Sequence, residues 1–155
     1  MIFIPYTEEN YKTANSYLSI SEADELLNDQ RQNETWINLE NEVKEVLLIK
    51  ASQLVDSAFM YQGIKISDEQ LLKFPRRNVD ISESEADKKI PLGAKMATVS
   101  LCLKFTNDEA FKNVTMEHIS KLTKQFKVID ESGLGDDVIC YLKQYKARTV
   151  RIGVR

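Results

Sequence analysis

The regular spacing of hydrophobic residues predicts two long helices in this chain. The first covers residues 39–59, where apolar positions recur three and four residues apart, as on one face of a helix. Its stripe is interrupted only by Lys50 and consists of Val43, Val46, Leu47, Ala51, Leu54, Val55 and Ala58. After an acidic loop at 81–89, the second helix begins with Ile90 and Pro91, since proline suits a first helical turn. Its apolar residues surround nearly the whole helix, as in a buried central element: Leu92, Met96, Ala97, Val99, Leu101, Cys102, Leu103 and Phe105.

Shorter patterns predict two further helices. Ser21 opens a sequence similar to a capping box, so we expect a short helix over 22–31. Asp136 or Asp137 is suited to cap a last helix over 138–146, because aspartate oxygens accept hydrogen bonds from the free N–H groups of a first turn.

The remaining segments predict a small amount of β-structure. Residues 61–79 lack a helical period, and 119–129 alternate in part, which favours a strand or hairpin arm with a helix as the alternative. Residues 149–155 alternate strictly and predict a β-arm. The expected fold is mainly α, a small bundle of about four helices with a minor β-hairpin or strand element and an extended C-terminal arm. We expect one domain over 1–147 and a basic arm over 148–155.

The composition is that of an ordinary globular domain. The chain has 155 residues, 43% of them hydrophobic, which is enough to bury a core without disulfides or metals. Its 5 glycines and 3 prolines are too few for the frequent turns of an all-β sandwich. Residues 1–5 are apolar but too short for a signal peptide. No apolar stretch approaches the roughly 20 residues of a membrane span, so we expect synthesis in the cytoplasm and no membrane association.

Candidate catalytic and metal-binding residues are scarce. The single histidine, His118, has no Cys or Asp ligand nearby, so a zinc site is not expected. Cys102 and Cys140 lie in apolar surroundings, where buried, reduced thiols are expected. The Gly-Leu-Gly sequence at 133–135 lacks the lysine of a phosphate-binding loop, and a polar turn explains it. We therefore predict no enzymatic activity, no metal and no cofactor.

Charge is distributed unevenly along the chain. The net charge is -3, but the last fifteen residues carry five cations and no acid, so the rest of the chain carries -8. A basic, extended end on an acidic body suggests an arm that docks on an acidic partner or a neighbouring subunit. A second interpretation is contact with nucleic acid, with Tyr141 and Tyr145 stacking on bases, and a third is a solvated tail. The apolar alternation favours a strand that pairs with other β-structure, and addition to a sheet of another chain is one route. Lys143 and Lys146 precede the candidate partner-binding residues, which are Arg148, Val150, Arg151, Ile152, Val154 and Arg155.

The order of several short motifs resembles a known family. The most specific is a Gln-x-Leu-x-aromatic-Pro-Arg motif, formed by Gln70, Leu72, Phe74, Pro75 and Arg76. Before it come Tyr-Leu-Ser-Ile-Ser-Glu-Ala-Asp at 17–24, Trp36, the helix that contains Lys44-Glu45 and closes on Leu54-Val55-Asp56, and Gly63. This order resembles the phage family of DnaT-like single-stranded-DNA-binding proteins, well over 17–105 and loosely beyond. Phe74 stands where that family usually has Trp.

The resemblance implies a structural virion protein. Many members of the family are encoded among head genes and look like head–tail connectors, also called adaptor or head-completion proteins, of tailed phages. Such a protein would form a ring of about twelve copies beneath the portal protein at the virion neck. The ring would extend the DNA channel and carry tail or tail-completion proteins. Double-stranded DNA would pass an acidic wall without specific binding, and the basic arm would reach an acidic portal surface. The alternative is a replication accessory protein that binds single-stranded DNA.

The Gln-x-Leu-x-aromatic-Pro-Arg motif has two interpretations. Phe74 and Pro75 could plug a loop into the core, while Arg76 binds helix carbonyls or acidic side chains. Alternatively, the motif contacts the neighbouring subunit of a ring.

Overall fold

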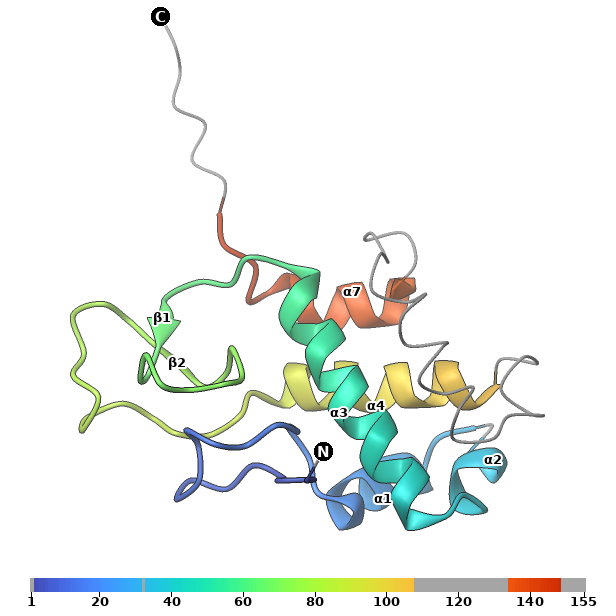
Figure 1. The fold of residues 1–155 in the computed structure, drawn as a ribbon. Helices are drawn as coiled ribbons and strands as arrows, with labels where there is room; N and C mark the ends of the chain where they lie inside the picture. Colours follow the sequence, from blue (N-terminus) through green and yellow to red (C-terminus); the bar gives the residue numbers. More distant parts are fainter. Residues whose placement is uncertain (1, 32, 108–133, 149–155) are drawn as a thin grey trace, which may run out of the picture.

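The computed structural model describes residues 2–31, 33–107 and 134–148. They form a mainly helical fold with a two-stranded antiparallel sheet, which confirms the predicted fold class (Figure 1). The predicted element at 119–129, His118 and residues 149–155 lie outside the described residues. The elements are α1 (Ile20–Asn28), α2 (Glu34–Ile37), α3 (Asn41–Ala58), β1 (Ile64–Lys65), β2 (Arg76–Arg77), α4 (Leu92–Asn107) and α7 (Asp136–Lys143).

Helix α4 is the centre of the core, as its apolar surface predicts. It packs against α7 and α3 and also contacts α1 and α2, and Figure 1 shows α3 crossing α4. Gly93 allows the closest approach in this bundle. A Cβ atom at this position would lie 2.6 Å from the Tyr141 carbonyl oxygen and 2.6 Å from Cε2 of Tyr145. The contact between α4 and the end of α7 therefore requires a residue without a side chain.

Helix α1 begins earlier than expected because Ser19, not Ser21, caps it. The Glu22 N–H donates to Ser19 Oγ (3.2 Å), and the Ser19 N–H donates to Glu22 Oε2 (2.9 Å), which completes a capping box. The expected cap at Ser21 is wrong because the residue three positions later is Asp24. Its carboxylate is engaged elsewhere and accepts a hydrogen bond from Trp36 Nε1 (2.8 Å).

Helix α3 confirms the longest predicted helix, with small differences at its ends. Lys50, which interrupts the apolar stripe, is half-buried, whereas Lys44 is buried. The Lys44 ammonium group lies 3.3 Å from Asp24 Oδ1 and 5.4 Å from the centroid of the Trp36 ring. Trp36 is fully buried in α2, a single turn that the hydrophobic pattern did not predict. A buried lysine is thus compensated by an acid and an aromatic face.

Helix α7 starts before the predicted helix because Gly135, with φ of 89°, occupies the N-cap position. Asp136 and Asp137 lie in the first turn instead, where negative charge favours the helix dipole. The expected burial of both cysteines is correct only for Cys102, and burial raises the pKa of its thiol. Cys140 is exposed, since α7 turns a different face toward the core.

The chain after α3 and the chain after α7 run side by side. Tyr61 forms an antiparallel bridge with Lys146. Two hydrogen bonds flank it, from Ala147 N to the Met60 carbonyl (2.7 Å) and from Gln62 N to the Tyr145 carbonyl (2.9 Å). Beyond the bridge the first chain continues into β1, which pairs with β2. The C-terminal segment therefore leaves the body beside the small sheet.

Candidate functional site

The Gln-x-Leu-x-aromatic-Pro-Arg motif lies largely inside the protein. Gln70, Leu72, Phe74 and Pro75 are buried, and Arg76 is half-buried. The Gln70 side-chain amide donates to the carbonyls of Leu72 (2.8 Å) and Pro75 (3.0 Å) and so holds the loop closed. The peptide bond between Phe74 and Pro75 is cis.

Phe74 is the centre of an aromatic cluster. Its ring centroid lies 4.6 Å from that of Tyr61, 5.6 Å from that of Tyr145 and 6.1 Å from that of Tyr17. These rings come from distant parts of the chain, and their tilted and edge-to-face arrangements are favourable for aromatic pairs. The motif therefore joins the chain segments before α1, after α3 and after α7.

Arg76 binds backbone carbonyls on both sides of the sheet. Its Nε donates to the Gln62 carbonyl (2.7 Å), and its Nη1 donates to the Lys73 carbonyl (3.2 Å). Its Nη2 donates to the carbonyls of Gly63 (2.6 Å) and Tyr61 (3.4 Å). A guanidinium group with its fixed fork of donors suits this arrangement. In the described residues Arg76 thus organises the loop, and contact of the motif with a neighbouring subunit stays a prediction.

Asp56 of α3 ties the motif to the helix. Its carboxylate accepts hydrogen bonds from Tyr17 Oη and from Lys73 N (3.2 and 3.3 Å to the two oxygens), and Tyr17 Oη accepts one from Phe74 N (3.1 Å). Burial raises the pKa of Asp56 to about 6, although the hydrogen bonds from Tyr17 and Lys73 oppose this shift. Burial, followed by the charge of Asp56, also raises the pKa of Tyr17 well above its usual value.

Asp56 is expected to make the fold more stable at mildly acidic pH. Its pKa rises from an ordinary 3.8 to about 6 on folding, so the folded chain binds the proton more tightly. This contribution to stability is present at low pH and is lost as the pH rises through 6. We expect the Asp56 contribution to the free energy of unfolding to fall by about 2 kcal/mol between about pH 4 and pH 7. Urea unfolding of the wild type and Asp56→Asn across this range measures it, because asparagine accepts similar hydrogen bonds but does not titrate.

Asp68→Asn is the matched control for this experiment, since Asp68 is exposed. It should unfold with the pH dependence of the wild type. The same pH dependence in the wild type and Asp56→Asn would contradict the raised pKa.

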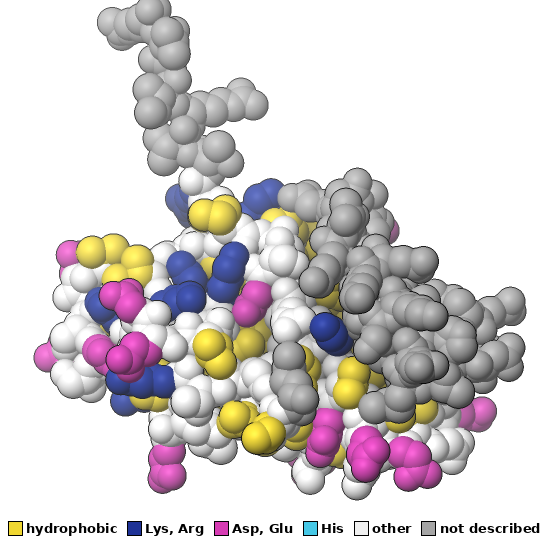
Figure 2. Space-filling model, viewed as in Figure 1, with side chains coloured by type: hydrophobic (Ala, Val, Ile, Leu, Met, Phe, Trp, Pro, Cys, Tyr) yellow, Lys and Arg dark blue, Asp and Glu magenta, His cyan; other side chains and the backbone are white. Residues whose placement is uncertain are grey.

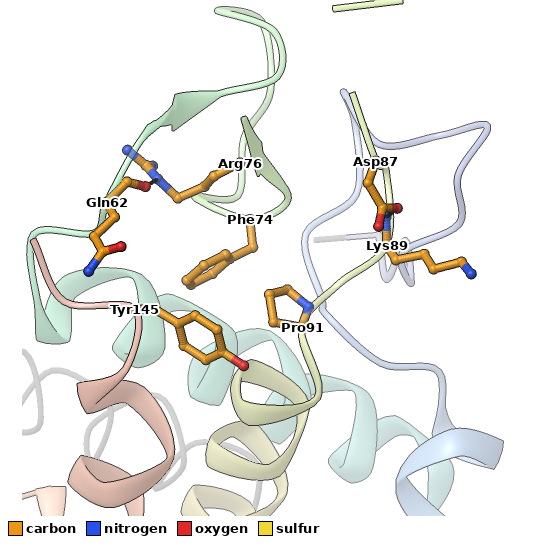
Figure 3. A pocket seen from close by; sticks show the side chains of 7 residues that line it. All are labelled: Gln62, Phe74, Arg76, Asp87, Lys89, Pro91 and Tyr145. Atoms are coloured by element: carbon orange, nitrogen blue, oxygen red, sulfur yellow. Dashed lines mark hydrogen bonds between the residues drawn. The ribbon is translucent and has the colours of Figure 1, made fainter. Parts of the chain in front are cut away.

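A hollow of about 260 Å³ opens beside Phe74 (Figure 3). Phe74, Pro91 and Tyr145 supply its apolar surface, and Figure 3 shows their three rings close together. Tyr145 Oη accepts a hydrogen bond from Gly93 N (3.3 Å), which holds the tyrosine ring at the N-terminus of α4. We call this space the aromatic hollow. Its polar lining consists of Gln62, Arg76, Asp87 and Lys89.

A second hollow of about 280 Å³ adjoins the first. We call it the Tyr6 hollow, and the two hollows share Lys89. Tyr6 Oη donates to the Lys88 carbonyl, and burial raises the pKa of the Tyr6 hydroxyl to about 12. The lining consists of Tyr6, Thr7, Glu8, Glu22, Lys89, Ile90 and Lys95.

Cations and acids are mixed in both hollows. In the Tyr6 hollow, Lys95 Nζ lies 3.1 Å from Glu22 Oε1. Burial alone would raise the pKa of Glu22, but hydrogen bonds from Ser19 and Lys95 lower it below its usual value. Lys89 is exposed and makes no ion pair with any described residue, so its ammonium group is available to an anionic ligand.

The basic C-terminal segment begins at the edge of the aromatic hollow. The side-chain amide of Gln62, a residue of the hollow, donates to the Lys146 carbonyl (3.0 Å), and Arg148 is exposed two residues later. Figure 2 shows Lys and Arg side chains in the centre and upper part of this face, with Asp and Glu side chains beside some of them. The other candidate arm residues lie outside the described residues: Val150, Arg151, Ile152, Val154 and Arg155.

Outside the motif, the sequence pointed to Tyr145 as a residue that could contact bases. It did not point to the other residues that line the two hollows. Lys89 and Asp87 belonged to a segment interpreted as an acidic loop, and Tyr6 was not singled out. The consecutive lysines at 88 and 89, which end that acidic loop, were the available signal. Over 2–31, 33–107 and 134–148, no three His, Cys, Asp or Glu side chains are placed to hold a metal ion, and no helix is long and apolar enough to span a bilayer.

Comparison with protein families identifies a match over most of the chain. Residues 3–134, which include the motif and both hollows except Tyr145, match a family described as "Putative DnaT-like ssDNA binding protein". This description names single-stranded DNA and does not name a head–tail connector. No curated protein and no solved structure matches the chain significantly. Because the match spans most of the 155 residues, the chain belongs to the family of DnaT-like single-stranded-DNA-binding proteins.

Proposed function

We propose that this protein binds single-stranded DNA on the face that carries the two hollows. The observation that carries the proposal is the shared position of Lys89, which joins two hollows that each combine aromatic and cationic side chains. Binding of single strands without a sequence code uses this combination, since bases stack on aromatic rings while cations follow the phosphates. The family description agrees with this chemistry.

The basic path continues from the hollows to the C-terminus. Lys95, Lys89 and Arg76 line the hollows, and Lys146 and Arg148 follow at the exit of the chain. Exposed acidic residues on the first three helices would repel phosphate, which disfavours a path of the strand along these helices. The exposed acids of α1, α2 and the start of α3 are Asp24, Glu25, Glu34, Glu40 and Glu42.

Anisotropy of a fluorescent single-stranded oligonucleotide tests the proposal. We expect binding that weakens by about 10- to 50-fold between about 50 and 200 mM salt, as for three to four phosphate contacts. A duplex of the same length is the control and should bind more weakly, because its bases cannot enter the hollows. Absence of binding at low salt, or binding that does not change with salt, would sink the proposal.

A second candidate is the head–tail connector, and the exposed apolar side chains favour it. Among the described residues, no exposed large hydrophobic side chain is aromatic, so none of them offers a ring on which a base could stack. Portal rings mixed with the full-length protein distinguish the candidates. A ring-shaped complex without oligonucleotide binding supports the connector, and the reverse supports the DNA-binding protein. The large hydrophobic side chains that are more than half exposed are Ile2, Ile37, Met60, Leu71, Val79 and Leu92.

A further inference from the structure

We propose that the aromatic hollow receives one base of the bound strand and prefers cytosine to thymine. This inference rests on the proposed function and assigns a role to one of its two hollows. The volume of about 260 Å³ lies just below the range for sites of drug-sized ligands, which begins at about 300 Å³. A single base with part of its sugar is a ligand of this size class.

The apolar surface of the hollow is held in place before any ligand arrives. The Tyr145 hydroxyl accepts a hydrogen bond from Gly93 N (3.3 Å). The backbone N–H of Tyr145 donates to the Leu142 carbonyl (3.0 Å), and the backbone carbonyl of Tyr145 accepts from Gln62 N (2.9 Å). The Phe74 ring packs edge-to-face against Tyr145, and Pro91 lies beside both (Figure 3). A base that stacks here orders few side chains, so little conformational entropy is lost on binding.

The surroundings of the hollow offer a position for one phosphate outside the base pocket. The ammonium group of Lys89 has no partner among the described residues, and Figure 3 shows it pointing away from the three rings. Helix α4 begins at Leu92, immediately after Pro91. The first turn of α4 contains no acid, so the positive end of its dipole is not neutralised there. The helix terminus favours negative charge beside Pro91, and Lys89 favours a phosphate on the side away from the rings.

Asp87 is the residue that gives the hollow a preference among bases. A carboxylate repels phosphate, but it accepts hydrogen bonds from the exocyclic amino group of cytosine. One oxygen, Asp87 Oδ1, accepts a hydrogen bond from Lys89 N (2.9 Å), which fixes the carboxylate at the rim. The second oxygen remains for a ligand. Thymine presents a carbonyl oxygen where cytosine presents its amino group, and two acceptors repel each other.

Titration of the full-length protein with dC and dT oligonucleotides of about ten residues tests the preference. We expect the dC oligonucleotide to bind about 5-fold more tightly than dT. Asp87→Asn keeps an oxygen for the Lys89 N–H but replaces the other acceptor with a donor, so the ratio should fall to about 1. Lys89→Ala should weaken both oligonucleotides by about 5-fold through the loss of one phosphate contact.

Two matched variants in the same loop serve as controls. Glu85→Gln removes another exposed carboxylate, and Lys88→Ala removes a lysine whose Nζ lies 4.8 Å from the Tyr11 ring centroid instead of in the hollow. Both should leave the ratio and the affinities unchanged, and circular dichroism should show all variants folded. Binding with equal affinity for dC and dT, or a ratio unaffected by Asp87→Asn, would overturn the base pocket and leave the proposed function standing. No binding of either oligonucleotide would overturn the proposed function itself.

Discussion

Replacement of Phe74 by alanine is expected to lower the free energy of unfolding by about 3–5 kcal/mol. Phe74 is 3% exposed, and its ring contacts the rings of Tyr17, Tyr61 and Tyr145. Truncation would leave a cavity between the chain segments before α1, after α3 and after α7, which the Phe74 ring joins. Since a domain of this size has a total stability of about 5–15 kcal/mol, the variant should be close to unfolded at physiological temperature. Urea denaturation followed by circular dichroism measures the loss.

Phe74→Trp and Leu71→Ala are the controls for this variant. Tryptophan adds volume on the side of the aromatic hollow, which can receive it, so we expect a loss of less than about 1.5 kcal/mol. Leu71 lies in the same loop but is 63% exposed, and its truncation should change stability by less than about 0.5 kcal/mol. If Phe74→Ala loses no more stability than Leu71→Ala, the Phe74 ring does not anchor the loop in the core.

Deletion of residues 148–155 is expected to reduce the affinity for single-stranded DNA by about 100-fold at about 0.1 M salt. The deletion removes three cations, Arg148, Arg151 and Arg155. Each phosphate contact on a single strand contributes about 0.7 to the slope of log affinity against log salt concentration. Loss of three contacts should therefore reduce the magnitude of this slope by about 2. The last described helix ends at Lys143, and the hydrogen bond from Ala147 N to the Met60 carbonyl involves only residues before the deleted segment. The circular dichroism spectrum should therefore keep its helical signal.

Replacement of the same three arginines in the full-length chain distinguishes the effect of their charge on affinity from the effect of the segment's length. Replacement of all three by glutamine should reproduce the loss, whereas replacement by lysine should keep the affinity within about 3-fold, because phosphate binding here depends on charge. Undiminished binding by the truncated chain would show that the arm is not part of the DNA-binding surface.

The helices were predictable because their signals are local. The apolar period of α3 and the nearly continuous apolar surface of α4 follow from which faces must be buried, and both helices lie where the pattern predicts. Helix starts were less predictable. Several residues compete for a cap, and the choice of Ser19 over Ser21 depended on Asp24 being engaged by Trp36, a residue of the next helix.

The candidate site could be predicted only in part. The hydrophobicity of Phe74 and Pro75 suggested burial, and the charge of the tail suggested a phosphate-binding or docking arm. The two hollows combine residues from six separate segments, and Lys89 and Tyr145 carry no local pattern that relates them.

The amino-acid order was therefore sufficient for the mainly helical fold class, the central position of α4 and the separation of an acidic body from a basic end. These properties depend on the burial of apolar faces and on charge along the chain. The packing of distant segments was needed to bring Tyr145 against Gly93, Arg76 against four carbonyls and Lys89 between two hollows. Those contacts join residues far apart in the chain, and they depend on the close approach of α4 and the end of α7, which a local pattern does not encode.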